Sequence, residues 1–190
     1  MVKIVFSNFD NLCTYYFLFS FQVFSSTAAS GILTNDLLSI MDLAADAGII
    51  ADSVDDNIFQ WNVKMKNFTK SDTLASDCQE LRALHGYDYI ELQLDFSMNL
   101  YPFFPPSLKV IRPRLQGSLM FGVTNVDCIK LSFWNPAQDM KTVLEKIKDF
   151  IQTWARLDVQ SERNDFKRYP EGTIIYNFNG YYGKRDFSPD

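Results

Sequence analysis

Apolar and polar residues alternate one by one in the middle of the chain. Residues 59–66 and 90–96 place an apolar side chain at every second position, with charged or amide side chains between them, and residues 108–111 form a shorter apolar run of the same kind. A period of two is typical of a strand with one buried face. The pattern therefore predicts three strands over these ranges.

The first of the regions with helical spacing precedes the strands. Thr34 or Asn35 is the predicted N-cap of a helix over residues 36–46, in which Leu37, Met41 and Ala44 share one face. A short polar side chain at the N-cap satisfies a backbone donor that the first turn leaves unpaired. We therefore expect a helix before the sheet.

Two further regions repeat apolar residues every three or four positions. Between the first two strands, the spacing of Leu74, Cys78 and Leu81 predicts a short helix inserted within residues 71–87. After the third strand, a longer amphipathic helix is predicted over residues 138–155. Its apolar face is Val143, Leu144, Ile147, Ile151 and Trp154. Residues 163–165 are expected to open one more short helix.

Both ends of the chain differ from the middle. Residues 1–33 contain an aromatic and apolar run at 13–24 followed by small residues. That run is shorter than the ~18–20 residues of a membrane span, so a cleaved signal, an added strand or helix on the core, and an N-terminal extension of unclear role all remain open. Residues 158–190 are predicted to be a polar, tyrosine-containing C-terminal extension, which leaves the domain at 34–157, with residues 68–87 inserted.

Composition narrows the class of partner. The 190 residues suit one folded domain, and a net charge of −5 disfavours nucleic acid and anionic membranes as partners. The acidity is concentrated at the N-terminal end, because residues 1–63 hold one Lys against seven Asp, which gives −6.

Cysteine and histidine usage argues against a metal or disulfide framework. Cys13, Cys78 and Cys128 are 65 and 50 residues apart, which fits neither zinc ligand spacing nor a small disulfide scaffold, and His85 is the only histidine. We therefore expect no metal and no cofactor, and a reducing compartment, cytoplasmic or nuclear.

The most specific motifs are a proline turn and a tryptophan motif. Residues 101–106 read Tyr-Pro-Phe-Phe-Pro-Pro, which excludes helix and sheet pairing and fixes an extended turn between the second and third predicted strands. Residues 134–137 read Trp-Asn-Pro-Ala and directly precede the long amphipathic helix. A rigid loop alone would explain the first motif, but not the order of the two.

This order resembles the ubiquitin-conjugating enzyme family over roughly residues 35–155. The insertion at 68–87 and the exit from the third strand, Val-Ile-Arg-Pro-Arg-Leu at 110–115, look most like its Q-type subgroup, which also lacks the usual His-Pro-Asn element. The resemblance implies an α+β, UBC-like fold: an N-terminal helix, a four-stranded antiparallel meander, and C-terminal helices packed on it.

The resemblance also implies a chemistry. Family members accept the carboxy terminus of ubiquitin, or of a ubiquitin-like modifier, as a cysteine thioester and transfer it to lysine. Cys128 is the cysteine between the proline turn and Trp134, so it matches the nucleophile, and Asn125 is the candidate oxyanion donor. A two-residue shift of the alignment would place Lys130 there instead, and Asp127 would raise the pKa of a nearby thiol.

The implied partners are the modifier, the ubiquitin-activating enzyme and a ubiquitin ligase. By matching motif, the ligase-binding residues are Phe103, Pro136 and Ala137. The family docks its activating enzyme through basic residues of the first helix, whereas here that region is acidic, which reverses the expected complementarity. Two alternatives stay open: a catalytically inactive variant that serves as a ubiquitin- or ligase-binding adaptor, and an RWD-like protein-interaction domain.

Overall fold

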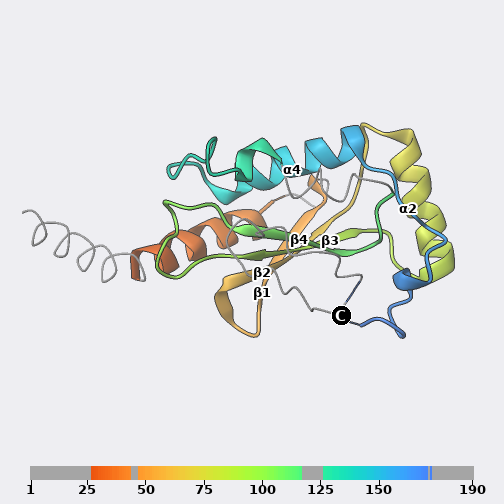
Figure 1. Ribbon diagram of the computed structural model, residues 1–190, viewed down its shortest axis with the longest axis horizontal. Helices are drawn as coiled ribbons and strands as arrows, with labels where there is room; N and C mark the ends of the chain where they lie inside the picture. The colour runs from red at the N-terminus through yellow and green to blue at the C-terminus, as the bar shows by residue number, and fades with distance from the viewer. Residues whose placement is uncertain (1–26, 44–46, 117–125, 171, 173–190) are drawn as a thin grey trace, which may run out of the picture.

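A four-stranded antiparallel sheet forms the centre of the molecule (Figure 1). The structure is a computed structural model that describes residues 27–43, 47–116, 126–170 and 172. The strands lie in the order β1-β2-β3-β4, each antiparallel to the next. They span Ile49–Val54 (β1), Asn57–Met65 (β2), Ile90–Asp95 (β3) and Ser107–Arg112 (β4). The three predicted strands are confirmed as β2, β3 and β4.

The sequence pattern did not locate β1. Its burial pattern alternates over the first residues only, and Asp52 is exposed near its centre. The register pairs Ile49 with Met65 and Ser53 with Trp61, so β1 is held by its backbone ladder with β2. A short edge strand with a polar centre carries little periodic signal, which explains the omission.

Both predicted helices after the first strand are present. Helix α2, Asp72–His85, is capped by Ser71, whose hydroxyl accepts from the amide of Leu74, and it buries the three predicted apolar residues. Helix α4, Met140–Trp154, is capped by Asp139 and lies along one face of the sheet (Figure 1). A short 3-10 helix, Glu162–Asn164, occurs where the C-terminal one was expected.

The core lies between α4 and the sheet. The side chains facing each other there are fully buried: Trp61, Val63 and Met65 of β2, Ile90, Leu92 and Leu94 of β3, and Val143, Leu144, Ile147 and Ile151 of α4. Trp154 does not join them, because it lies in the last turn of α4 and is 59% exposed. Its predicted place on the buried face is therefore wrong.

The helix before the sheet includes residues that the sequence assigned to an extension. Residues 27–41 are helical, and Ala29 and Leu33 are fully buried in the core. Thr34 lies within this helix and donates its hydroxyl to the Ser30 carbonyl at 2.8 Å. The predicted N-cap at Thr34 or Asn35 is therefore wrong, because the apolar contacts of residues 29 and 33 extend the helix toward the N-terminus.

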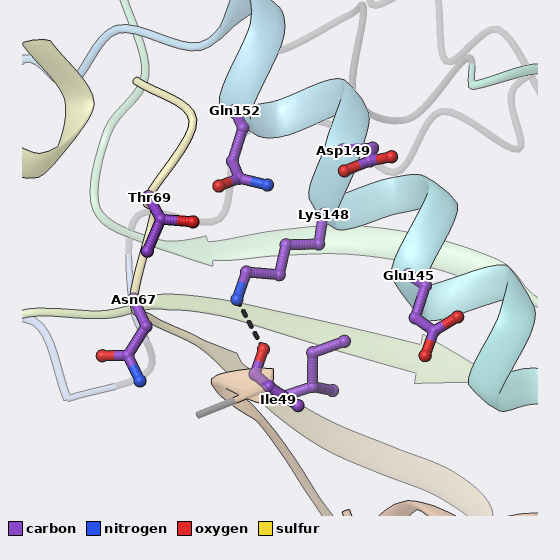
Figure 2. A pocket seen from close by; sticks show the side chains of 8 residues that line it. Ile49, Asn67, Thr69, Glu145, Lys148, Asp149 and Gln152 are labelled. Atoms are coloured by element: carbon purple, nitrogen blue, oxygen red, sulfur yellow. Dashed lines mark hydrogen bonds between the residues drawn. The ribbon is translucent and has the colours of Figure 1, made fainter. Parts of the chain in front are cut away.

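A lysine of α4 fixes the start of β1. Lys148 extends beneath the helix into a groove of about 350 Å³, where its ammonium donates to the backbone carbonyl of Ala47 at 2.5 Å (Figure 2). Burial lowers the pKa of Lys148 below its usual value. Gly48 has a positive φ of 62°, and a Cβ there would meet the Lys148 Nζ at 2.8 Å. This close approach requires a glycine.

The face of the sheet opposite α4 carries a network of polar side chains. Asp95 of β3 accepts from Gln60 and Gln93 and forms an ion pair with Lys109 at 2.6 Å. Glu91 accepts from Asn62 and forms an ion pair with Arg112 at 2.6 Å. These cross-strand contacts join β2, β3 and β4 on their polar side.

Residues 155–170 fold back onto the edge of this sheet. Leu157 forms a bridge with Leu115, and the buried Asn164 side chain accepts from the Arg114 amide at 2.9 Å. Arg112 donates to the carbonyl of Pro170 at 2.6 Å and lies under the ring of Phe166, 4.3 Å from its centroid. The described part of the predicted C-terminal extension is therefore packed against the domain.

No helix in the described part of the chain is long and apolar enough to cross a membrane. The described residues also contain no group of three or more metal-binding side chains.

Candidate functional site

Cys128 lies in a short 3-10 helix that is anchored on both sides. The helix spans Asp127–Ile129, and the side chains of Val126 and Ile129 that flank the cysteine are buried in the core. Cys128 itself is only partly buried and packs against the core from its edge. Cys128 is therefore neither fully buried nor fully exposed, on a short helix that Val126 and Ile129 anchor to the core.

Charges of both signs act on this thiol. Burial raises the pKa of Cys128, the carboxylate of Asp127 raises it further, and the ammonium of Lys146 on α4 lowers it. Lys146 also donates to the side-chain oxygen of Gln138 at 3.2 Å. The net effect keeps the pKa above its ordinary value, so the protonated thiol predominates at neutral pH.

Lys130 is part of a surface ion pair. Its ammonium lies 2.8 Å from Asp127, whose side chain is largely exposed, whereas that of Lys130 is partly exposed. This pairing places positive charge next to the carboxylate that opposes ionisation of the thiol. Asn125, the predicted oxyanion donor, lies outside the described residues, so its role stays a prediction.

The two other cysteines differ from Cys128. Cys78 is buried in α2, where burial, with Asp77 and Asp88, raises its pKa to about 12. A buried thiol of this kind is a packing residue rather than a nucleophile. Cys13 lies outside the described residues. Of the two described cysteines, Cys128 is therefore the accessible one.

The proline turn and the tryptophan motif are joined directly. The indole N–H of Trp134 donates to the carbonyl of Pro102 at 2.6 Å, and its ring lies 6.3 Å from that of the buried Tyr101. Asn135 accepts from the amide of Ala137 at 3.0 Å, which closes a turn after the tryptophan. The hydrogen bond brings the two predicted ligase-binding loops side by side.

Each predicted ligase-binding side chain is exposed on these loops. Phe103 follows Pro102 directly and is 48% exposed, and Pro136 and Ala137 are exposed on the neighbouring turn. Trp134 itself is only partly exposed, because its ring packs against the core and its indole N–H is bonded to Pro102.

Sequence reasoning missed several members of this surface. The same two loops expose five more large apolar side chains: Met98, Leu100, Phe104, Leu131 and Phe133. With Phe103, Pro136 and Ala137 they form what we call the loop surface. Residues 130–133 read Lys-Leu-Ser-Phe, a pattern equally suited to a strand, so the sequence alone gave no reason to expect both apolar residues in solvent.

Relatives of known class resemble most of this chain. It is 27% identical over 139 residues to human ubiquitin-conjugating enzyme E2 Q1, covering 68% of this chain and 32% of that protein. It is 22% identical over 161 residues to a probable ubiquitin-conjugating enzyme of Acanthamoeba polyphaga mimivirus, covering 84% of this chain and 11% of that protein. The chain thus spans a third or less of these relatives' own lengths.

A solved structure of the same class also superposes. It is a ubiquitin conjugating enzyme E2 from Plasmodium falciparum, with a TM-score of 0.48 at 13% identity, covering 64% of this chain and 96% of that one. No protein-family model matches the chain. The sequence similarity to these proteins identifies the chain as a divergent relative of the ubiquitin-conjugating enzymes.

Proposed function

We propose that the protein takes part in ubiquitin or ubiquitin-like conjugation and carries the modifier as a thioester on Cys128. The observation that carries the proposal is that Cys128 is only partly buried, at the edge of the core and on the loop that leads into Trp134. An RWD-like interaction domain has no need of an accessible thiol at this position.

The chemistry requires two acyl transfers. The Cys128 thiolate attacks the modifier's C-terminal carbonyl, which arrives as a thioester on the activating enzyme. The new carbon–sulfur bond forms as the old one breaks, and the activating enzyme's cysteine leaves as a thiolate that takes up the proton that Cys128 gave to water on ionising. The neutral amine of the acceptor lysine then attacks the same carbonyl and loses one proton to water. The carbon–nitrogen bond forms as the carbon–sulfur bond breaks, and Cys128 leaves as the thiolate. Lys146 favours that anion in both steps.

The loop surface supplies the proposed ligase contact. Aromatic and aliphatic side chains exposed on adjoining loops are typical of a protein-binding surface. Because the loops are held together by the hydrogen bond from Trp134 to Pro102, the surface is formed before any partner binds. We place the ligase contact at Phe103, Pro136 and Ala137.

A charging assay tests the enzymatic proposal. The full chain is incubated with ubiquitin-activating enzyme, ATP and ubiquitin, and the products are separated without reducing agent. We expect an adduct that dithiothreitol removes and that Cys128→Ala abolishes. Cys78→Ala is the matched control and should still charge. If no adduct forms with ubiquitin or with any ubiquitin-like modifier, given each modifier's own activating enzyme, Cys128 is not a nucleophile.

One observation favours an adaptor as the second candidate function. Burial and Asp127 both raise the pKa of Cys128, which disfavours the thiolate that a conjugating enzyme needs. An uncharged variant of this fold would still present the loop surface. In that case, ligase binding should persist in Cys128→Ala and be lost in Phe103→Ala, as measured by calorimetry with a purified ligase domain.

A further inference from the structure

Gln138 connects the tryptophan motif to helix α4. It follows the Trp-Asn-Pro-Ala motif directly and precedes Asp139, the N-cap of α4. Its backbone amide donates to the carbonyl of Asn135 at 3.1 Å. The backbone of Gln138 is therefore fixed by the turn that exposes Pro136 and Ala137, and its side chain starts from a defined position.

The side-chain amide of Gln138 makes a hydrogen bond at one of its two ends. Its oxygen accepts from the ammonium of Lys146 on α4 at 3.2 Å. Its nitrogen is buried and has no hydrogen-bond partner among the residues that the structure describes. A buried donor without a partner costs free energy that an apolar side chain of the same shape would avoid. The stability of the fold therefore gives no reason for an amide at this position.

Lys146 needs a partner if its ammonium is to keep one position. Its side chain is exposed on α4, and an unrestrained lysine samples many rotamers. Asp149, one helical turn further along, is engaged by Lys70 at 2.7 Å. The contact with the Gln138 oxygen therefore restricts where the Lys146 ammonium lies.

The ammonium of Lys146 lies close enough to Cys128 to act on its thiol. The 3-10 helix that carries Cys128 contacts α4, and the positive charge of Lys146 lowers the pKa of the thiol. The other charges beside the thiol belong to its own loop. Asp127 raises the pKa of Cys128, and Lys130 pairs with Asp127 at 2.8 Å. Of the charged side chains of α4, Lys146 is the one that acts on the thiol.

We propose that Gln138 is a positioning residue whose side-chain oxygen holds the Lys146 ammonium beside Cys128. A cation that is fixed near a thiol stabilises the thiolate more than a cation that moves through solvent. Gln138 acts through Lys146 and not on the sulfur itself. This role rests on the proposed function, since a thiol that carries no modifier has no need of a stabilised thiolate.

A purely structural role for Gln138 makes a different prediction. Gln138→Met keeps the length of the side chain and removes both polar atoms. If the amide only supported the turn, this change would destabilise the protein and leave the thiol as it was. If the amide positions Lys146, the variant should be at least as stable as the wild type in urea, because the unpaired buried nitrogen is gone, and the thiol should change.

Alkylation of Cys128 tests the proposal on the full chain, without any activating enzyme. The rate of its reaction with iodoacetamide is followed against pH, and mass spectrometry of the peptides assigns the site. We expect Gln138→Met to shift the profile to higher pH, by less than Lys146→Gln, which removes the charge itself. Gln160→Met is the matched control, because the amide of Gln160 is also hydrogen-bonded, but to Glu80 of α2 at 2.6 Å. Its profile should match that of the wild type.

A double variant shows whether Gln138 acts through Lys146. If it does, Gln138→Met should add no shift in the Lys146→Gln background, because the charge that it positions is absent. Two results overturn the proposal. Either Gln138→Met has the wild-type profile, or it shifts the profile by the same amount whether Lys146 is present or not.

The proposed function and the positioning role fail in different ways. A chain that forms no adduct in the charging assay, yet shows these shifts, would overturn the proposed function and leave the effect of Gln138 on the free thiol. A chain that charges on Cys128, yet has an unchanged profile in Gln138→Met, would overturn the positioning role alone.

Discussion

The face of the sheet opposite α4 and the loop that carries Cys128 differ in how their polar groups are paired. On the sheet, Glu91 and Arg112 are 8% and 5% exposed, and each has further partners that close the network. On the loop, the Cys128 thiol is only partly covered, and large apolar side chains such as Phe133 lie in solvent. The paired charges of the sheet stabilise the structure, and the exposed apolar side chains of the loop leave the protein surface for binding.

Removal of Arg112 should have the largest effect on stability. Arg112→Ala leaves the buried Glu91 carboxylate without its ion pair, which costs about 3–5 kcal/mol in comparable cases. Urea unfolding measures the loss. Arg163→Ala is the control, because Arg163 is exposed, and it should change the free energy of unfolding by no more than about 0.5 kcal/mol. Equal effects from both would contradict the importance of the buried pair.

Phe166→Ala should have a smaller effect on the same contact. Phe166 lies over the guanidinium of Arg112 and is half exposed, so the loss of this cation–π contact should cost about 1 kcal/mol. Phe133→Ala, which removes a similarly exposed ring from the loop surface, should leave the unfolding midpoint nearly unchanged. If Phe133→Ala is the more destabilising, the two regions do not differ as described.

The polar network should also make stability depend on pH. Burial tends to raise the pKa of Asp95, but hydrogen bonds and charge from Lys109, Gln60 and Gln93 outweigh it and lower the pKa. A lowered folded-state pKa stabilises the fold above the unfolded value of about 3.9 and loses that contribution as pH falls through the folded value. Urea unfolding from pH 6 to pH 2 should show a steeper loss for the wild type than for Asp95→Asn.

Changes of charge near Cys128 should alter the reactivity of its thiol and hardly change the stability of the protein. Lys146→Gln removes the cation that lowers the pKa of Cys128, and Asp127→Asn removes a carboxylate that raises it. The rate of alkylation by iodoacetamide, followed against pH, should therefore shift to higher pH in the first variant and to lower pH in the second. An unchanged profile in both variants would show that burial alone controls the pKa of the thiol.

A comparison of Cys128 and Cys78 tests directly whether burial protects a thiol from alkylation. In the native protein Cys128 should be alkylated while Cys78, buried in α2, is protected, and both should react in urea. Mass spectrometry of the peptides assigns each site. Native alkylation of Cys78 at the rate of Cys128 would mean that α2 opens more easily than its packing indicates.

Local patterns were sufficient for the elements whose buried and exposed residues alternate clearly along the sequence. The alternation over residues 59–66 predicts β2, and the spacing of Leu74, Cys78 and Leu81 predicts α2, because these elements expose one side and bury the other. The same logic failed for Trp154, since a helix can leave its last turn beyond the sheet. It also failed for the first helix, whose N-terminal part is fixed by the packing of Ala29 and Leu33.

The sequence by itself determined the order of β2, α2, β3, β4 and α4 and the motifs at 101–106 and 134–137, because periodicity and proline geometry act over short stretches of chain. Only the tertiary structure decided that Lys146 of α4 acts on the Cys128 thiol and that Trp134 is bound to Pro102. Each of these depends on distances between residues far apart in the chain, which packing of the core sets and no local pattern contains.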